Sequence, residues 1–156
     1  MSHIDEQVIF GCVEYISMPQ FGIKDVIAKI DTGAFSGAMH CSLIEEYTRP
    51  SDGKNILRFI PSDNQANVTE VEDYEVIQVR SSTGHEVRRY LVGTEMIIKD
   101  TRYTITIGLS DRSKMQREIL IGRRFLRENN ILVDTRIHQE LDNDGGDKQY
   151  ENSDSI

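Results

Sequence analysis

The stretch that decides the fold lies near the N-terminus and reads Val26-Ile27-Ala28-Lys29-Ile30-Asp31-Thr32-Gly33-Ala34. Its apolar residues at even positions alternate with Ile27 and Lys29, and this period of two predicts a β-strand that leads directly into Asp31. A strand holds such a carboxylate rigidly, while the next two residues add a hydroxyl and let backbone amides approach it closely. The carboxylate can then act as a general base. Asp-Thr-Gly is also an ordinary turn sequence, so the triplet alone leaves both interpretations open.

Outside this stretch the chain reads mostly as short strands. Strands are expected over residues 8–15, 56–60, 74–80, 86–92, 95–98 and 103–109, with further apolar strands at 119–121 and 131–133. One helix is expected over residues 123–128, because it follows Gly122 and ends at two asparagines suited to a left-handed C-terminal position. Many short strands with one short helix predict an all-β fold, a closed or nearly closed barrel.

Composition and charge limit the partners of this chain. Its 156 residues fit one domain, and its net charge of −8 repels phosphate backbones and anionic lipid surfaces. Neither nucleic acid nor a membrane is therefore expected as a partner. No stretch approaches the ~20 apolar residues of a spanning helix, and no apolar leader follows the polar N-terminus. Cys12 and Cys41 are interpreted as two reduced thiols, which favours the cytoplasm.

The charge is concentrated at the C-terminal end. Residues 140–156 carry six acidic side chains against Lys148 alone, a local charge of −5, and almost no apolar side chains. Such a segment cannot repay the entropy of ordering, so we expect a folded domain over residues 1–139 and a disordered acidic tail over residues 140–156. A calcium loop at Asp142-Asn143-Asp144-Gly145 is disfavoured because the spacing lacks the twelfth-position glutamate.

A second motif follows Asp31 by some ninety residues. The run Ile119-Leu120-Ile121-Gly122-Arg123 is an apolar strand that ends on glycine and leads into the expected helix. This pairing resembles the retropepsin-like aspartic proteases, in which such an element lies across the loop that bears the catalytic Asp-Thr/Ser-Gly-Ala. Further runs resemble the branch of that family named ATP-dependent zinc proteases; they are residues 24–41, 80–85, 109–115, 120–123 and 132–134.

The resemblance implies a fold, a mechanism and a partner. The fold is a closed acid-protease barrel with one short helix after Gly122. The mechanism is peptide-bond hydrolysis in which Asp31 from each of two subunits activates water, because aspartic proteolysis needs two carboxylates that share one proton. The partners are a second copy of the chain and a peptide or protein substrate. Thr32, Gly33 and Ala34 would support the active-site loop together with Gly122.

The zinc and ATP in that branch name have no counterpart among the sequence motifs. The chain has no phosphate-binding Gly-x-x-x-x-Gly-Lys-Ser/Thr loop and no His-Glu-x-x-His, and its four histidines are far apart. No metal and no cofactor are therefore expected. Two alternatives stay open, a catalytically silent peptide-binding module on the same fold and a zinc peptidase that uses His40 or His85.

The residues expected to line a substrate cleft come from two turns. Ser82, Thr83 and Gly84 are candidates for the tip of a flap that closes over the peptide, although an ordinary hairpin turn has the same sequence. Asp111 could face Asp31 as a second carboxylate, but an ion pair with Arg112 or Arg123 is the simpler interpretation. Four arginines concentrate positive charge and would favour acidic peptides if they line the cleft, or form a solvated face if they do not; they are Arg80, Arg88, Arg89 and Arg112.

Overall fold

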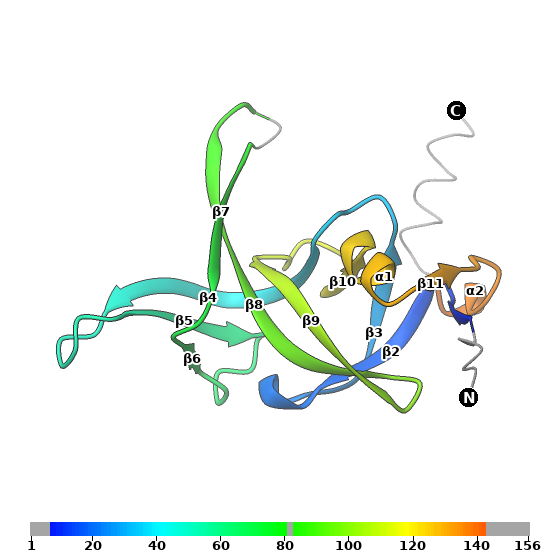
Figure 1. Cartoon of the computed structure of the whole chain (residues 1–156), viewed down its shortest axis with the longest axis horizontal. Helices are drawn as coiled ribbons and strands as arrows, with labels where there is room; N and C mark the ends of the chain where they lie inside the picture. Colours follow the sequence, from blue (N-terminus) through cyan, green and yellow to red (C-terminus); the bar gives the residue numbers. More distant parts are fainter. Residues whose placement is uncertain (1–6, 81–82, 143–156) are drawn as a thin grey trace, which may run out of the picture.

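The computed structural model describes residues 7–80 and 83–142, and these residues are built mostly from β-strands (Figure 1). The strands are β1 (Val8–Phe10), β2 (Val13–Met18), β3 (Ile23–Asp31), β4 (Gly37–Thr48), β5 (Asn55–Pro61), β6 (Thr69–Val71), β7 (Glu75–Arg80), β8 (Glu86–Ile98), β9 (Thr101–Ser110), β10 (Ile119–Gly122) and β11 (Ile131–Val133). Three short helical segments join them: the 3-10 turn η1 (Pro19–Phe21), α1 (Arg123–Glu128) and α2 (Gln139–Asp142). The prediction of an all-β fold is confirmed.

Six of these strands close into a barrel. Around its wall the order is β10, β3, β2, β8, β9 and β4, and β4 pairs again with β10 to complete the circle. The β10–β3 and β9–β4 pairs are parallel, and the other four are antiparallel. Closure gives each of the six strands two hydrogen-bonded neighbours, which removes the exposed edges of an open sheet. The predicted closed barrel is thus confirmed.

The alternation in the deciding stretch is visible in β3. Ala28 and Ile30 are buried in the core, whereas Lys29 between them is exposed. The strand begins at Ile23, three residues before the predicted start, and it ends on Asp31 as predicted. The side-chain pattern of β3 therefore both seals the barrel and brings Asp31 to the end of a rigid strand.

A chain of aromatic rings closes one side of the core. The ring of Tyr103 makes edge contacts with Phe10, at 6.3 Å between centroids, and with Phe125, at 5.2 Å. Phe125 belongs to α1, and its side chain is buried. The predicted helix at Arg123–Glu128 is confirmed; its Phe125 packs on Tyr103 of β9, and the helix also contacts β10 and β11.

Two hairpins extend beyond the barrel wall, as Figure 1 shows. The first half of β4 belongs to the barrel, and from Cys41 onward the strand pairs with β5 in an arm that also carries β6. The second hairpin pairs β7 with the first residues of β8, while the rest of β8 runs through the barrel beside β9. The β7–β8 hairpin is the element in which a flap was predicted.

The structure differs from the sequence predictions in several elements. The strand expected over residues 8–15 is divided into β1 and β2, and neither β6 nor the 3-10 turn η1 was predicted. The long strand β4 was not predicted, and β8 is one continuous strand where two were expected, over residues 86–92 and 95–98. Residues 140–142, assigned to the tail, are the last three residues of α2, which contacts β2. The remaining residues of that tail, 143–156, lie outside the described residues, so their disorder stays a prediction. Among the helices that the structure describes, none is long and apolar enough to cross a bilayer.

We predict that Phe125→Ala lowers the free energy of unfolding by about 3–5 kcal/mol, because it removes a fully packed ring and leaves a cavity beside Tyr103. Denaturant-induced unfolding measures this loss. Tyr15→Ala serves as the control, since the Tyr15 side chain is about half exposed on β2, and its effect should stay below about 1 kcal/mol. Equal losses in the two variants would contradict the assigned core.

Candidate active site

Asp31 lies where β3 ends, and its backbone is fixed on one side by β10. The two strands run in parallel, and Gly122 stands opposite Asp31 in their register. The Asp31 loop, residues 31–37, leads from there to the start of β4. Asp31 is half-buried, so its carboxylate is held by the barrel and still reachable from outside.

One oxygen of the Asp31 carboxylate is fixed by the loop itself. The Gly33 amide donates a hydrogen bond to Oδ1 at 2.9 Å, and the Ala34 amide donates to the Asp31 carbonyl at 3.2 Å. Among the described residues, Oδ2 has no hydrogen-bond partner. A carboxylate that is oriented through one oxygen and free at the other can accept a proton from water.

Gly122 lies under the Asp31 loop, where no side chain fits. A Cβ at this position would stand 2.9 Å from the Ala34 carbonyl oxygen and from the Gly37 nitrogen, and closer still to the Phe35 oxygen. Directly after Gly122, the first two amides of α1 donate to the carbonyls of Ala34 and Phe35, at 2.8 and 3.0 Å. Helix amides that lack partners within the helix therefore hold the loop in place.

Arg112 lies within electrostatic reach of both Asp31 and Arg89. Burial lowers the pKa of Arg112, the Asp31 carboxylate partly raises it again, and the positive charge of Arg89 lowers it further, so both charged groups lie within electrostatic reach of Arg112. The stem of Arg89 lies across Gly108, where an added Cβ would meet its Cδ at 3.3 Å. No ion pair of either guanidinium group with an acidic side chain occurs within residues 7–80 and 83–142.

The other predicted cleft residues are placed differently. Arg88 pairs with Glu46 at 3.2 Å on the arm, away from the Arg89 side of β8. Asp111 forms no ion pair with Arg112 or Arg123, which corrects that interpretation. Its carboxylate is 74% exposed and lies 3.7 Å from a nitrogen of His40. It accepts a hydrogen bond from the Ser113 amide, and bonding to Ser113 lowers the pKa of Asp111.

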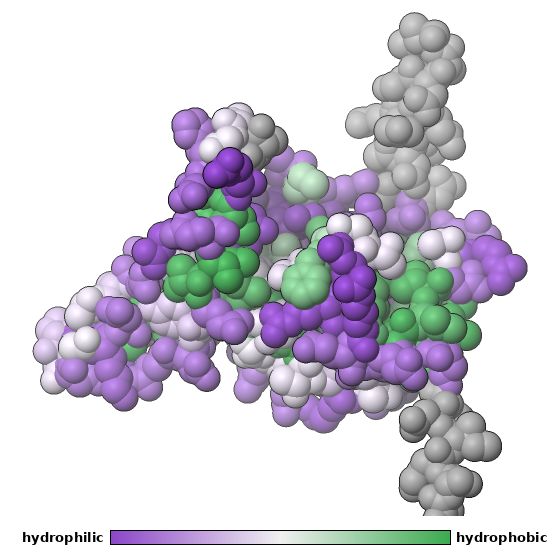
Figure 2. All heavy atoms as spheres, turned by 45° about the horizontal axis from the view of Figure 1, so that its top comes forward, coloured by the Kyte–Doolittle hydropathy of each residue, from purple (hydrophilic) through white to green (hydrophobic). Residues whose placement is uncertain are grey.

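The β7–β8 hairpin, where the flap was predicted, extends beyond the barrel wall. Thr83 and Gly84 lie at its tip, with Gly84 at a φ of 86°, a conformation that favours glycine; Ser82 lies outside the described residues. Apolar side chains below the tip are exposed, namely Val76, Ile77 and Val87. Figure 2 shows this apolar surface beneath the hydrophilic tip, and a second apolar patch over β1 and β11.

Comparison with protein families matches residues 9–140 to the family described as RimB-like, retropepsin-like aspartic endopeptidase RimB. The chain belongs to this RimB-like family. The match spans both the Asp31 loop and the Gly122 crossing, the two motifs on which the resemblance rested. The barrel that these motifs occupy is therefore a retropepsin-like barrel.

Curated relatives carry a different name. A protein of Shewanella pealeana is 23% identical over 133 residues, and one of Desulfotalea psychrophila is 27% identical over 142 residues; each is named "Probable alpha-L-glutamate ligase". These matches cover 83% and 85% of this chain but 29% of each relative. The chain therefore spans less than a third of the length of these relatives.

A solved structure shares the fold. The crystal structure of Lpg0085 from Legionella pneumophila, a protein of unknown function, superposes with a TM-score of 0.63 at 26% sequence identity. The alignment covers 83% of this chain and 95% of the other. Nearly the whole of that protein is thus similar to this domain.

The zinc implied by the name of the similar branch can be tested on one group of side chains. Ligand atoms of His40, Asp63 and Glu118 lie within 4.8 Å of one another. The Arg112 amide donates to Nδ1 of His40 at 2.8 Å, so the ring proton sits on Nε2 and points to Asp63 at 3.0 Å. A metal needs an unprotonated ring nitrogen, and the one available faces an N–H group. These residues do not fit a zinc ion, and His85 joins no comparable group within the described chain.

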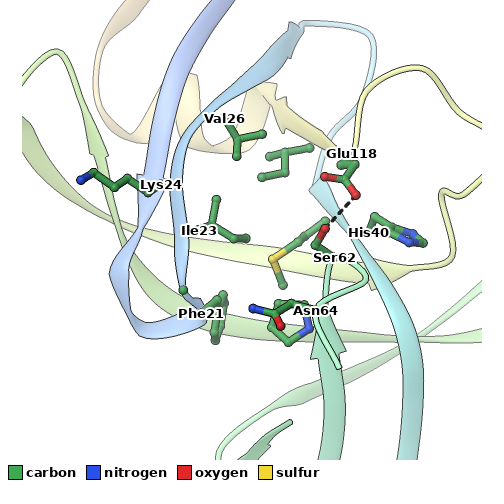
Figure 3. Close-up of a pocket in the computed structure, with 12 residues that line it drawn as sticks. Phe21, Ile23, Lys24, Val26, His40, Ser62, Asn64 and Glu118 are labelled. Carbon is green, nitrogen blue, oxygen red and sulfur yellow. Dashed lines mark hydrogen bonds between the residues drawn. The ribbon is translucent and has the colours of Figure 1, made fainter. Parts of the chain in front are cut away.

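A cavity of about 270 Å³ lies elsewhere on the barrel (Figure 3). Apolar side chains such as Phe21, Ile23 and Val26 form its floor, and Ser62 donates a hydrogen bond to Glu118 at its rim. Asp31 does not line it, and Val26, the lining residue of β3 nearest to Asp31 in sequence, is about 16 Å away along the strand. The cavity is therefore distinct from the candidate active site.

Two residues that contact the predicted site residues were not predicted from the sequence: Gly108, which contacts Arg89, and Asp63, which contacts His40. A glycine within a strand can have several roles, so Gly108 gave no clear signal. Its role here, to leave room for the Arg89 side chain of the neighbouring strand, is visible only in the folded structure. Asp63 was missed because it reaches His40 through folding alone, across 23 residues of sequence. A turn-rich segment around Asp63 was the one available signal.

We predict that Gly122→Ala destabilises the fold by about 1–3 kcal/mol or more, because its Cβ would overlap three backbone atoms of the Asp31 loop. Denaturant unfolding measures the loss, and the amide signals of the loop should shift in an NMR spectrum. The matched control is Gly93→Ala on β8, where an added Cβ meets nothing within 4 Å. A Gly122→Ala variant as stable as the Gly93→Ala variant would refute the crossing.

Proposed function

We propose that this chain is an aspartic endopeptidase that works as a homodimer, with one Asp31 from each subunit. The observation that carries the proposal is the state of the Asp31 carboxylate, oriented through Oδ1 by Gly33 and open at Oδ2. Among the described residues, no second acidic side chain is bonded to it. The missing carboxylate would come from the same loop of a second copy, as the family relationship favours.

In this mechanism the two carboxylates share one proton. Their proximity pushes their pKa values apart, so that one is ionised while the other stays protonated. The ionised carboxylate takes a proton from a water molecule, which attacks the carbonyl carbon of the peptide. The protonated one donates its proton to the carbonyl oxygen. Breakdown of the tetrahedral intermediate, with proton transfer to the amine, completes the cleavage.

The surface around Asp31 supports the pairing of two copies. Phe35 in the Asp31 loop is half exposed, and Ile9 and Leu132 form an exposed apolar pair across β1 and β11. A hollow of about 380 Å³ beside this pair is lined by Thr32 as well as by Leu132. Exposed apolar surface next to an incomplete site is typical of a protein interface.

The substrate we propose is an acidic peptide, one with glutamate side chains near the cleaved bond. The charges of Asp31 and of Arg89 both act on Arg112, and neither arginine has an acidic ion-pair partner in the described residues; two such guanidinium groups favour carboxylates. The relatives whose longer chains include a similar region are named for glutamate ligation. Glutamyl peptides agree with both observations.

We expect Asp31→Asn to lower kcat on a glutamate-rich peptide by about 10²–10⁴-fold while the fold survives, because the amide cannot act as a base yet is nearly the same size. Mass spectrometry of the products and initial rates measure the effect. Asp25→Asn is the control, since it changes the charge equally, lies exposed on β3, and its φ of 51° suits asparagine. Binding of the peptide without cleavage by the wild-type chain would indicate a silent binding module instead.

Mixing chains tests whether two copies share a site. With random exchange, an equal amount of the Asp31→Asn chain should reduce the activity of a fixed amount of wild type to about half, because mixed dimers have one carboxylate. The Asp25→Asn chain should raise the total activity in the same experiment. Unchanged activity after addition of Asp31→Asn chains would mean that each chain acts alone.

Substrate charge tests the arginines. Arg89→Gln should raise KM for a glutamate-rich peptide about tenfold and leave KM for its glutamine counterpart unchanged, because one charge-assisted hydrogen bond is lost. The control is Arg102→Gln, which removes an exposed guanidinium that pairs with Glu95 on the barrel surface. Equal KM changes for both peptides would exclude Arg89 from charge recognition.

A further inference from the structure

His40 is a buried polar side chain on β4 whose two ring nitrogens are both bonded to other parts of the chain. Its side chain is 2% exposed, and both ring nitrogens have partners: the Arg112 amide donates to Nδ1, and Nε2 lies 3.0 Å from an oxygen of Asp63. A backbone amide can donate only to an unprotonated nitrogen, so the ring is held in the tautomer with its proton on Nε2. That proton is donated to the Asp63 carboxylate.

The backbone around the ring leaves it little freedom. The His40 amide donates to the Glu118 carbonyl at 2.8 Å, and the His40 carbonyl accepts from the Ser62 amide at the same distance. The Ser62 hydroxyl in turn donates to the Glu118 carboxylate, the bond drawn in Figure 3. The position of the ring is therefore determined by β4, by the segment after β5 and by the residue before β10.

On its other side the ring determines where the Arg112 loop, residues 111–118, begins. The loop leaves β9 after Ser110, which lies opposite His40 in the register of β4 and β9. At Arg112 the backbone is held by Nδ1 of His40, and the Nε of Arg112 donates to the Arg117 carbonyl at 3.1 Å. The guanidinium group that these two bonds orient lies within electrostatic reach of Asp31.

We propose that His40 is a positioning residue for the active site: its Nε2-protonated tautomer, set by Asp63, holds the Arg112 amide and so keeps the Arg112 guanidinium on the side of the barrel that carries Asp31, where it can receive a substrate carboxylate. The last step rests on the proposed function. The bond between the Arg112 amide and Nδ1 of His40 is independent of that function, because it follows from the geometry of the structure. Asp63 thereby influences substrate binding although its own carboxylate is exposed on the surface.

The tautomer can be measured directly on the full wild-type chain. Long-range hydrogen–nitrogen NMR correlations of histidine rings distinguish a protonated nitrogen from an unprotonated one, and the His40→Asn spectrum assigns the His40 signals. We expect an unprotonated Nδ1 and a protonated Nε2, unchanged by a chelator or by added Zn²⁺. A proton on Nδ1, or a zinc-dependent shift of Nε2, would overturn the proposal and favour a metal site.

Two variants distinguish the role of Nδ1, which accepts from Arg112, from the role of Nε2, which donates to Asp63. In His40→Asn the side-chain oxygen stands where Nδ1 stood and can accept from the Arg112 amide, whereas His40→Gln reaches toward Asp63 and leaves that amide without its acceptor. Amide hydrogen exchange at Arg112 should be about three- to tenfold faster in His40→Gln and close to wild type in His40→Asn, in line with one lost hydrogen bond. Equal exchange in both variants would refute the hold of His40 on Arg112.

Measurements of KM and kcat test whether the hydrogen bond between His40 and Arg112 affects substrate binding. His40→Gln should raise KM for a glutamate-rich peptide three- to tenfold with kcat within about twofold, and His40→Asn should restore the wild-type KM. A general loss of packing would instead affect both variants and the thermal midpoint. If the Arg112 amide exchanges faster in His40→Gln but KM stays at the wild-type value, the positioning role of His40 is contradicted and the proposed endopeptidase activity is not. If the wild-type chain cleaves no peptide, the proposed function fails, and the NMR and exchange measurements still decide whether His40 holds Arg112.

Discussion

The arrangement of this molecule depends on one close approach, the passage of β10 under the Asp31 loop. Because Gly122 has no side chain, the strand can pair with β3 on one side and β4 on the other while its backbone lies against the loop carbonyls. The same passage closes the barrel and directs the first amides of α1 into the loop. A single packing constraint thus joins the closure of the fold to the orientation of the Asp31 carboxylate.

Around this crossing the charged groups are arranged by packing more than by ion pairs. The stem of Arg89 lies across Gly108, where a side chain would stand in its way, and the backbone of Arg112 is bonded to the ring of His40. Most other arginines in the described residues are neutralised by nearby acids, as in the bonds of Arg58 to Glu45 and Glu70. The unpaired positive charge of Arg89 and Arg112 is therefore local, in a chain whose net charge is −8.

The sequence predicted the elements whose pattern is local. The strand that leads into Asp31 alternates over a few residues, and α1 stands between a glycine and two asparagines, so both were found with their boundaries nearly right. The strand β4 was missed because its first half is buried on both faces in the barrel, whereas its second half belongs to an exposed arm. No single period describes such a strand. Contacts of Asp63 and Gly108 were missed for another reason, since they arise between strands that only the folded barrel brings together.

The parallel pairing of β3 with β10 also has a consequence for how the chain folds. The contact between Gly33 and Arg123 joins residues 90 positions apart, and β1 pairs with β11 over a still longer stretch. Contacts of such long range form late, because the loop between them must first be closed. During synthesis the Asp31 loop therefore emerges long before the strand that shapes it. The carboxylate can take its working geometry only when nearly the whole domain has left the ribosome.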